Sequence, residues 1–368
     1  MNFIHPTPMS SSRWTTALAV VLALVLAFVA LAASAQAPER GLSFAHKDWE
    51  LVCDNTRTCR AAGYHAEGDD DMAGVSVLLT RKAGPREPVT GELLLASYGD
   101  DTQAAKLPKD ARLGMFVDGR AVGTVVWADD SGGLALSPAQ TQALLQALVG
   151  TGRVVWKAGK AQWALSNAGA TAVLLKMDEF QGRVGTSGAL VKRGAADEAA
   201  VAQPLPAPVV KAAATDDRPV KLGAQQKQQL LRALRAATPD ADSCELLSGA
   251  NAGAELEVRR LGRNQLLASG VCWTAAYNQG SGFWVINARE PYAPVLVTTD
   301  GSDYSAGTVS ADHKGRGLGD CWHHEAWTWD GKAFVPTLSA STGQCRLIAP
   351  GGAWHLPTWV ANVVPARP

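Results

Sequence analysis

Hydrophobic and polar positions alternate over short runs along most of the chain, which is the pattern of half-buried β-strands. The run 75–79 is apolar and stands between turn-forming residues, as expected of a strand. Asp118-Gly119 separates two further apolar runs and is a typical two-residue hairpin turn. Near the C-terminus, two Trp alternate with Thr over 327–329 before a second such dipeptide, Asp330-Gly331. The pattern predicts a fold rich in β-hairpins.

Helical periodicity is confined to a few segments. Ser137, Pro138 and Gln140 predict a helix start, because Ser caps, Pro suits the first helical position and Gln completes a capping box. Apolar residues recur at helical spacing after this start, again over 166–180, and on one side of the polar segment 225–237. We therefore predict a mainly β fold with a few short helices.

The first 35 residues have the features of a cleaved signal peptide. Arg13 precedes the uncharged run 17–33, and Ala33-Ser34-Ala35 places small residues at the cleavage site. A membrane anchor is the alternative, but a span needs about 20 apolar residues and this run is shorter. We expect an exported chain that starts at Gln36, with no stable membrane insertion after signal cleavage.

Six Cys follow the predicted signal, and an even number in an exported chain indicates disulfides. Several pairings are open from the sequence. Proximity favours Cys53–Cys59, Cys244–Cys272 and Cys321–Cys345. A zinc site is the alternative, but the chain has no C-x2-C pair, so we predict no metal and no other cofactor.

A Pro- and Ala-rich segment, 195–222, divides the chain in composition and predicts an extended linker. We expect a signal peptide over 1–35, an N-terminal β-rich domain over 36–194, and this linker. A helix and a Trp-rich C-terminal β domain would follow over 223–368. The prediction is thus two disulfide-stapled β-rich units.

Composition narrows the classes of partner. The chain has 34 Lys+Arg and 34 Asp+Glu, a formal net charge of zero. Nucleic-acid binding and attachment to an anionic membrane surface both need a basic face, so neither is expected. Hydrophobic residues make up 47% of the chain, enough for a packed core.

A set of motifs carries a resemblance to a known family. The motifs are Asp48-Trp49-x3-Cys53-Asp54-Asn55-x3-Cys59, Met177-Asp178-Glu179-x-Gln181-Gly182-Arg183, Cys272-Trp273-x3-Tyr277-Asn278, Lys314-Gly315-Arg316-Gly317-Leu318-Gly319-Asp320-Cys321 and Trp329-Asp330-Gly331-x2-Phe334. With them the chain resembles a family of exported proteins of Gram-negative bacteria described only as a domain of unknown function. The resemblance implies a periplasmic location and supplies no catalytic residues.

The N-terminal half has a second likeness. Its opening aromatic residue, the Asp48-Trp49 pair, the nearby Cys53 and the closing segment 169–172 are similar in layout to invasion-associated locus B proteins. Those are small exported β-rich proteins linked to host-cell invasion. They usually have a further Cys pair, whereas no Cys lies between Cys59 and Cys244 here.

The segment 314–320 is the strongest candidate for a binding site. Its three alternating Gly let a backbone approach a ligand closely, and Lys314 and Arg316 favour an anion or a glycan. A tight β-turn locked by Cys321 is the alternative. We take Lys314, Arg316 and Asp320 as binding candidates. Tyr277, Asn278 and Trp284 complete the candidate set, because exposed aromatic residues can stack on sugars or peptides.

Catalytic and metal-binding constellations are weaker. Asp178 and Glu179 are adjacent, so on a helix their carboxylates diverge by about 100°. His323 and His324 are adjacent too, so in a strand they point to opposite faces and cannot hold one ion. The remaining candidates for these roles are Asp320, Glu325, His313 and His355.

The sequence therefore favours a non-enzymatic periplasmic protein that binds an envelope component, a glycan or a protein partner. A cell-wall or carbohydrate-active enzyme is the first alternative, and it would need paired carboxylates in a cleft. A host-directed or lysozyme-inhibitor-like protein is the second.

Overall fold

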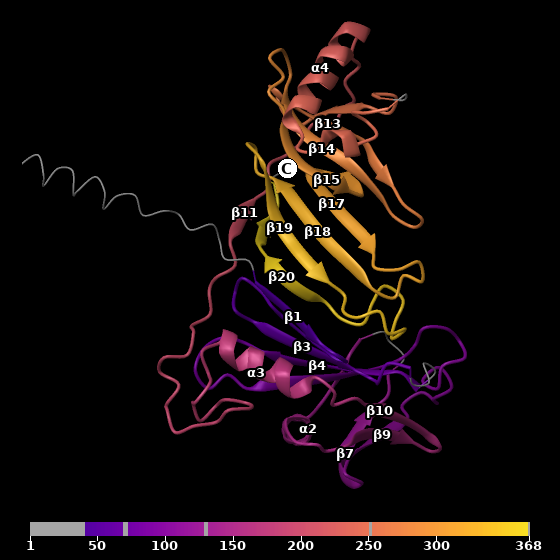
Figure 1. Cartoon of the computed structure of the whole chain (residues 1–368), viewed down its shortest axis with the longest axis vertical. Coiled ribbons are helices and arrows are strands. Elements are labelled where there is room, and N and C mark those ends of the chain that lie inside the picture. Colours follow the sequence, from indigo (N-terminus) through magenta and orange to yellow (C-terminus); the bar gives the residue numbers. More distant parts are fainter. Residues whose placement is uncertain (1–40, 69–72, 129–131, 250–251, 367–368) are drawn as a thin grey trace, which may run out of the picture. The chain divides into compact units, whose positions relative to one another are not determined.

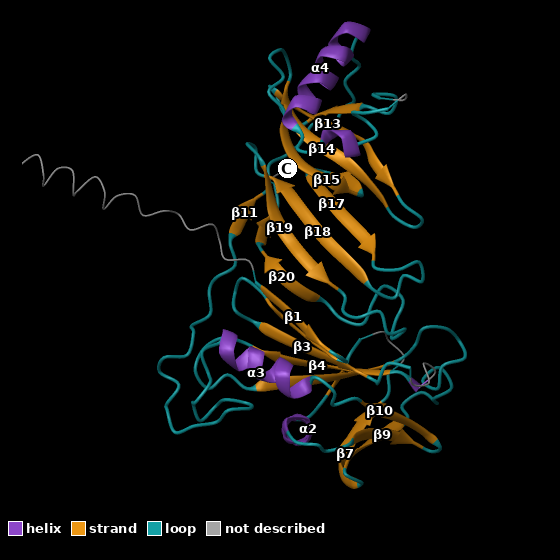
Figure 2. Cartoon of the chain, viewed as in Figure 1, coloured by secondary structure: helices purple, strands orange, loops and turns teal. Residues whose placement is uncertain are grey.

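The computed structural model describes residues 41–68, 73–128, 132–249 and 252–366 (Figure 1). The predicted signal peptide lies outside the described residues. Figure 2 shows that strands dominate, which confirms the mainly β prediction. The described part of the chain holds three α-helices. None of the described helices is long and apolar enough to cross a membrane.

The N-terminal half is built on an antiparallel sheet, in which each strand pairs with the next until the last position. In the described residues its order is β1 (Leu42–His46), β2 (Trp49–Cys53), β3 (Cys59–Tyr64), β4 (Val75–Arg81), β5 (Val89–Leu95) and β8 (Leu134–Ala135). A second sheet has the order β10 (Ala161–Leu165), β9 (Val154–Ala158), β6 (Arg112–Val117) and β7 (Arg120–Val126). Asp118-Gly119 joins β6 to β7 as the predicted hairpin turn.

Two helices pack against the first sheet and enclose the main hydrophobic core. They are α2 (Pro138–Val149) and α3 (Ala170–Phe180). The predicted capping box of α2 is present, because Gln140 N donates to Ser137 Oγ and Ser137 N donates to Gln140 Oε1. The core contains the buried rings of Trp49, Trp156 and Trp163.

The C-terminal half holds two larger antiparallel sheets. The first has the order β12 (Glu257–Arg260), β13 (Gln265–Thr274), β14 (Gln279–Asn287) and β15 (Val295–Gly301) in the described residues. The second has the order β16 (Asp303–Ser305), β17 (Thr308–Lys314), β18 (Trp322–Trp329), β19 (Phe334–Ser341) and β20 (Leu356–Val360). The helix α4 (Ala224–Ala237) covers the first of these sheets through Leu230 and Leu234 (Figure 1).

The segment from β19 to β20 packs on the second face of the N-terminal sheet. Ile348, Trp354 and Leu356 form a buried cluster with residues of that sheet, including Tyr64. Trp354 Nε1 also donates a hydrogen bond of 2.7 Å to Ser76 Oγ. The N-terminal sheet is therefore covered by helices on one face and by the C-terminal segment on the other.

The predicted linker segment, 195–222, makes defined contacts. Glu198 and Val201 are buried. The short strand β11 (Val209–Lys211) pairs in parallel with β21 (Asn362–Val364). The described residues between 41 and 366 belong to one unit, and this segment is part of it. The domain boundaries at 194 and 223 stay a prediction.

Three disulfides are present: Cys53–Cys59, Cys244–Cys272 and Cys321–Cys345. These are the pairs that lie nearest in the sequence. The first closes the β2–β3 turn, the second ties β13 to the segment after α4, and the third fixes the loop between β17 and β18.

Candidate functional site

The predicted binding segment is the loop between β17 and β18. Its two ends are joined by a hydrogen bond of 2.8 Å from Gly315 N to Cys321 O. Gly315 has no room for a side chain, because an added Cβ would lie 2.7 Å from Cys321 Sγ. Gly319 has a φ of +71°, which favours Gly. Two of the three Gly are thus required by the shape of the loop itself.

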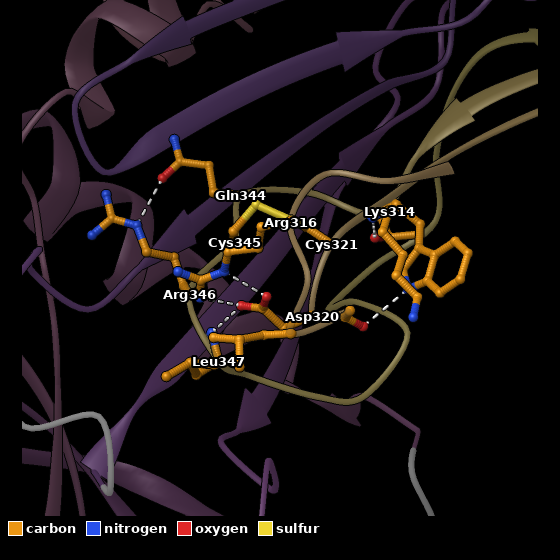
Figure 3. The surroundings of a disulfide bond; sticks show 12 residues. Lys314, Arg316, Asp320, Cys321, Gln344, Cys345, Arg346 and Leu347 are labelled. Atoms are coloured by element: carbon orange, nitrogen blue, oxygen red, sulfur yellow. Dashed lines mark hydrogen bonds and ion pairs between the residues drawn. A yellow bond between two sulfur atoms is a disulfide. The ribbon is translucent and has the colours of Figure 1, made fainter. Parts of the chain in front are cut away.

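Arg316 and Asp320 form an ion pair inside the loop. Arg316 Nε and Nη2 donate to the two oxygens of Asp320 at 2.7 and 2.6 Å. Figure 3 shows the Asp320 carboxylate between this guanidinium and the backbone N–H of Leu347, which donates to Oδ2 at 2.8 Å. Burial alone would raise the pKa of Asp320, but the bonds from Arg316 and Leu347 outweigh it and lower the pKa below 3.8. The guanidinium is engaged with Asp320, which weakens the case for an external anion.

Lys314 is held at the base of the loop. The amide of Asn278 pairs with its backbone, since Nδ2 donates to Lys314 O and Oδ1 accepts from Lys314 N, both at 3.0 Å. The Lys314 ammonium lies 5.5 Å from the ring centroid of Trp322, in cation–π contact. Trp322 Nε1 in turn donates to Gly319 O at 2.9 Å.

The loop displays apolar and aromatic side chains. Leu318 at its tip is 54% exposed, and Tyr277 is 46% exposed. The Tyr277 ring lies beside Gly317, where an added Cβ would be 3.5 Å away. Tyr98 donates its hydroxyl to Leu318 O. We call Tyr98, Tyr277, Lys314, Leu318 and Trp322 the loop surface.

Trp284 is not part of the loop surface, so its prediction as a contact residue is wrong. It is fully buried in the core under α4, and its Nε1 donates to Thr238 Oγ1 at 3.0 Å. The residue lies on an inward-facing position of β14, a central strand of its sheet. The other five predicted binding residues do come together at the loop.

A second feature is a cleft of about 580 Å³, which we call the polar cleft. Its walls come from β1 and β2 of the N-terminal sheet and from β17, β18, β19 and β20. It is lined by Ser43, Glu50, Val52, Ala311, His313, His323, Glu325, Ser339, Ala340, Ser341, Gly343, Leu356 and Thr358. Most of these residues are small or hydroxylated, and the ionisable ones are two Glu and two His.

The strand register brings the ionisable residues of the cleft onto one face. His313 on β17 lies directly opposite His323 on β18, and Glu325 follows His323 by two positions. The prediction that His323 and His324 point to opposite faces is consistent with this register. His324 instead pairs with Asp312, at 2.6 Å from Nδ1 to Oδ1, and stacks on Trp322.

Glu50 enters the cleft from β2. Tyr64 Oη and Gln344 N donate to its Oε1 at 2.7 and 2.8 Å. Burial raises the pKa of the Glu50 carboxyl above 4.5, and these two hydrogen bonds offset only part of that effect. Sequence reasoning missed Glu50, because nothing near it in the chain marks it as different from any other strand residue.

The acidic residues named from the sequence as catalytic candidates have separate surroundings. Asp178 is fully buried and accepts from Leu190 N and Val191 N. Glu179 pairs with Lys176 on the surface of α3. Of these candidates, only Glu325 lines the polar cleft.

A metal group is not indicated at the loop. In the described ranges, the one cluster with metal-ligand spacing is Asp320, Cys321 and Cys345. Both sulfur atoms are committed to a disulfide, and the Asp320 carboxylate is bound by Arg316. This group therefore has a structural role.

Comparison with known proteins identifies the family of this chain. A model of the family described as "Protein of unknown function (DUF1176)" matches residues 43–361. The chain belongs to this family. A protein of Escherichia coli (strain K12) described as "Uncharacterized protein YpfG" is 25% identical over 340 residues, which cover 85% of this chain and 90% of that protein. No solved structure matches the chain.

The range matched by the DUF1176 model includes the loop surface and the whole lining of the polar cleft. It also includes all three disulfides. The resemblance to a family of unknown function is confirmed, and the family's description assigns no activity to either feature.

Proposed function

We propose that this chain is an exported periplasmic protein that binds a protein partner of the cell envelope through the loop surface. The observation that carries the proposal is the exposure of Leu318 and Tyr277 at a loop that is held by a disulfide, an internal ion pair and a backbone hydrogen bond between its ends. Tyr is enriched among the few residues that supply most of the binding energy in protein interfaces, and burial of the exposed Leu318 side chain would add apolar contact area. A rigid loop loses little conformational entropy when it binds, which favours affinity.

The internal bonds of the loop favour a protein partner over a free anion. Arg316 is bound to Asp320, and Lys314 is stacked on Trp322. Within the loop surface, Leu318 and Tyr277 are the most exposed residues. A sugar could stack on Tyr277, but an exposed Leu contributes little to glycan binding, so the proposal commits to a protein.

Substitution of the tip tests the proposal. The mature chain would be immobilised and exposed to a detergent extract of Gram-negative envelopes. We expect a retained protein that is lost with Leu318→Asp and kept with Leu205→Asp, a control that alters an equally apolar, 44% exposed residue elsewhere. Equal retention by the Leu318→Asp chain would overturn the proposal, and retention of a glycan alone would favour the glycan alternative.

Export has its own test. Mass spectrometry of the chain purified from a periplasmic fraction should show a start at Gln36 and no free thiol. A chain found only in the cytoplasm, or one that keeps residues 1–35, would contradict the location.

A second candidate, a cell-wall or carbohydrate-active enzyme, is favoured by one observation. Glu50 and Glu325 line the same cleft, and a carboxyl with a raised pKa is suited to act as a general acid. Release of soluble fragments from purified peptidoglycan, abolished by Glu50→Gln, would support this candidate. No release at any protein concentration would remove it.

A further inference from the structure

We propose that the polar cleft is a binding site for a small ligand that carries a primary ammonium group and further hydrogen-bond donors. This inference is independent of the loop surface. The cleft volume, about 580 Å³, is in the range of small-molecule sites in proteins. The class of ligand follows from the charges and hydrogen-bonding groups of the lining.

Two carboxylates make the polar cleft a site for positively charged groups. Glu50 and Glu325 line it, and no Lys or Arg is among its lining residues in the part of the chain that the structure describes. An anionic ligand would therefore meet two carboxylates and no cation. An ammonium group would meet two acceptors of opposite charge, and such charge-assisted hydrogen bonds are stronger than neutral ones.

Both carboxylates keep unused acceptors. Glu325 has no hydrogen bond or ion pair to any of the described residues, although it is half-buried. The two hydrogen bonds of Glu50 both reach Oε1, which leaves Oε2 without one among the described residues. Partly buried carboxylate oxygens without a partner lose hydration without a compensating bond. A cationic donor from a ligand would supply that bond.

His313 has a ring nitrogen without a hydrogen-bond partner beside the cleft. Its Nε2 lies 2.7 Å from the carbonyl oxygen of Asp300, which only accepts, so Nε2 carries the proton. Nδ1 is buried and has no partner among the described residues. His323 opposite has no side-chain hydrogen bond there either. The imidazoles thus add hydrogen-bonding capacity that the fold itself does not use.

Hydroxyl groups complete the lining. Ser43, Ser339, Ser341 and Thr358 face the same cleft. Among the described residues, the only side-chain hydrogen bonds of these four run from the Thr358 hydroxyl to Ser339, at 3.2 Å to its carbonyl oxygen and 3.3 Å to its hydroxyl oxygen. Hydroxyls both donate and accept, so this wall suits the hydroxyl groups of an amino sugar or the second amine of an aliphatic diamine. Both ligands share the ammonium group.

A metal ion is the less favoured occupant. His313, His323 and Glu325 share a face, but their ligand atoms do not form a group with metal-ligand spacing in the described residues. We therefore treat zinc as an alternative to be tested.

Equilibrium binding to the full mature chain tests the inference. Isothermal titration calorimetry would compare glucosamine and 1,4-diaminobutane with N-acetylglucosamine and glucuronate, which lack the free ammonium. We expect binding of at least one ammonium ligand and at least tenfold weaker binding of both controls. Binding of glucosamine but not of the diamine would indicate that the natural ligand is an amino sugar. Binding of the diamine but not of glucosamine would indicate a polyamine.

Substitution locates the site. Glu325→Gln keeps the size of the side chain and removes its charge, so it should lower the affinity for the ammonium ligand at least tenfold. Glu257→Gln on β12 serves as control, because that carboxylate is exposed, pairs with Arg259 and does not line the polar cleft. No binding by either ammonium ligand, equal affinity for N-acetylglucosamine, or an unchanged affinity in Glu325→Gln would overturn the inference. Binding of zinc alone would replace it with a metal site.

Discussion

The side-chain amide of Asn55 forms hydrogen bonds with both the backbone C=O and the backbone N–H of Val360. Asn55 Nδ2 donates to Val360 O at 3.0 Å, and Asn55 Oδ1 accepts from Val360 N at 2.8 Å. Asn55 stands in the turn closed by Cys53–Cys59, where Asp54 Oδ1 accepts from Thr56 N. A turn at one end of the chain therefore holds the last strand of the C-terminal sheet.

We expect Asn55→Ala to destabilise the chain by about 2 kcal/mol, because two hydrogen bonds are lost and two backbone groups of Val360 lose their partner. Urea unfolding followed by Trp fluorescence would measure the difference. Asn362→Ala is the control, since that side chain is exposed and makes no hydrogen bond to the described residues. A loss no larger than in the control would contradict the structural role of Asn55.

Each disulfide should stabilise the folded chain by an amount that increases with the length of the loop that it closes. Cys321–Cys345 spans 24 positions and Cys53–Cys59 spans 6. On the chain-entropy model, their removal costs about 3.4 and about 2.2 kcal/mol. Paired Cys→Ser variants and their urea midpoints measure this. A smaller effect from the Cys321–Cys345 pair would show that strain or residual structure outweighs loop entropy.

Local features of the fold were predictable because their causes are local. The helix start at Ser137 rests on three neighbouring residues, and the β6–β7 turn rests on Asp118-Gly119. Cysteine pairing by proximity also gave the disulfides that the structure contains.

The cleft was not predictable from such signals, because its walls come from distant parts of the chain. Glu50 belongs to β2 and Glu325 to β18, and only the packing of the C-terminal segment on the N-terminal sheet brings them together. One contact in the cleft was predictable from the sequence. If 315–321 is taken as a hairpin loop, the strand register places His313 opposite His323. Trp284 was misassigned because exposure cannot be inferred from residue type alone.

A buried ion pair should hold the predicted linker against the N-terminal half. Arg183 Nη1 donates to Glu198 Oε1 at 2.7 Å, and Arg183 is fully buried. Glu198→Ala leaves a buried guanidinium without its carboxylate partner, which costs about 3–5 kcal/mol. We expect faster cleavage by trypsin within 195–222, read by mass spectrometry of the fragments.

The control is Glu179→Ala, because that carboxylate is exposed and pairs with Lys176 on the same helix. Its cleavage rate should equal that of the unmodified chain. If the Glu198→Ala chain is cut no faster than the control, the ion pair does not hold the segment in place.

The pH dependence of stability should report the Arg316–Asp320 pair. Because the folded pKa of Asp320 lies below 3.8, the folded state favours the charged carboxylate. Its contribution is therefore fully present above the unfolded pKa of about 3.9 and is lost as the pH falls through the lower folded pKa. Asp320→Asn removes that contribution and should cost about 1–3 kcal/mol at pH 7.

The stability difference between the two chains should be constant from pH 7 to about pH 5 and shrink below about pH 4, as measured by urea midpoints at each pH. Asp330→Asn is a matched control in the β18–β19 turn, where the carboxylate is exposed and accepts from the backbone N–H groups of Lys332 and Ala333. A difference for Asp320→Asn that grows toward acid would mean that the carboxylate is destabilising when charged, which would overturn the assignment of Arg316 as its stabilising partner.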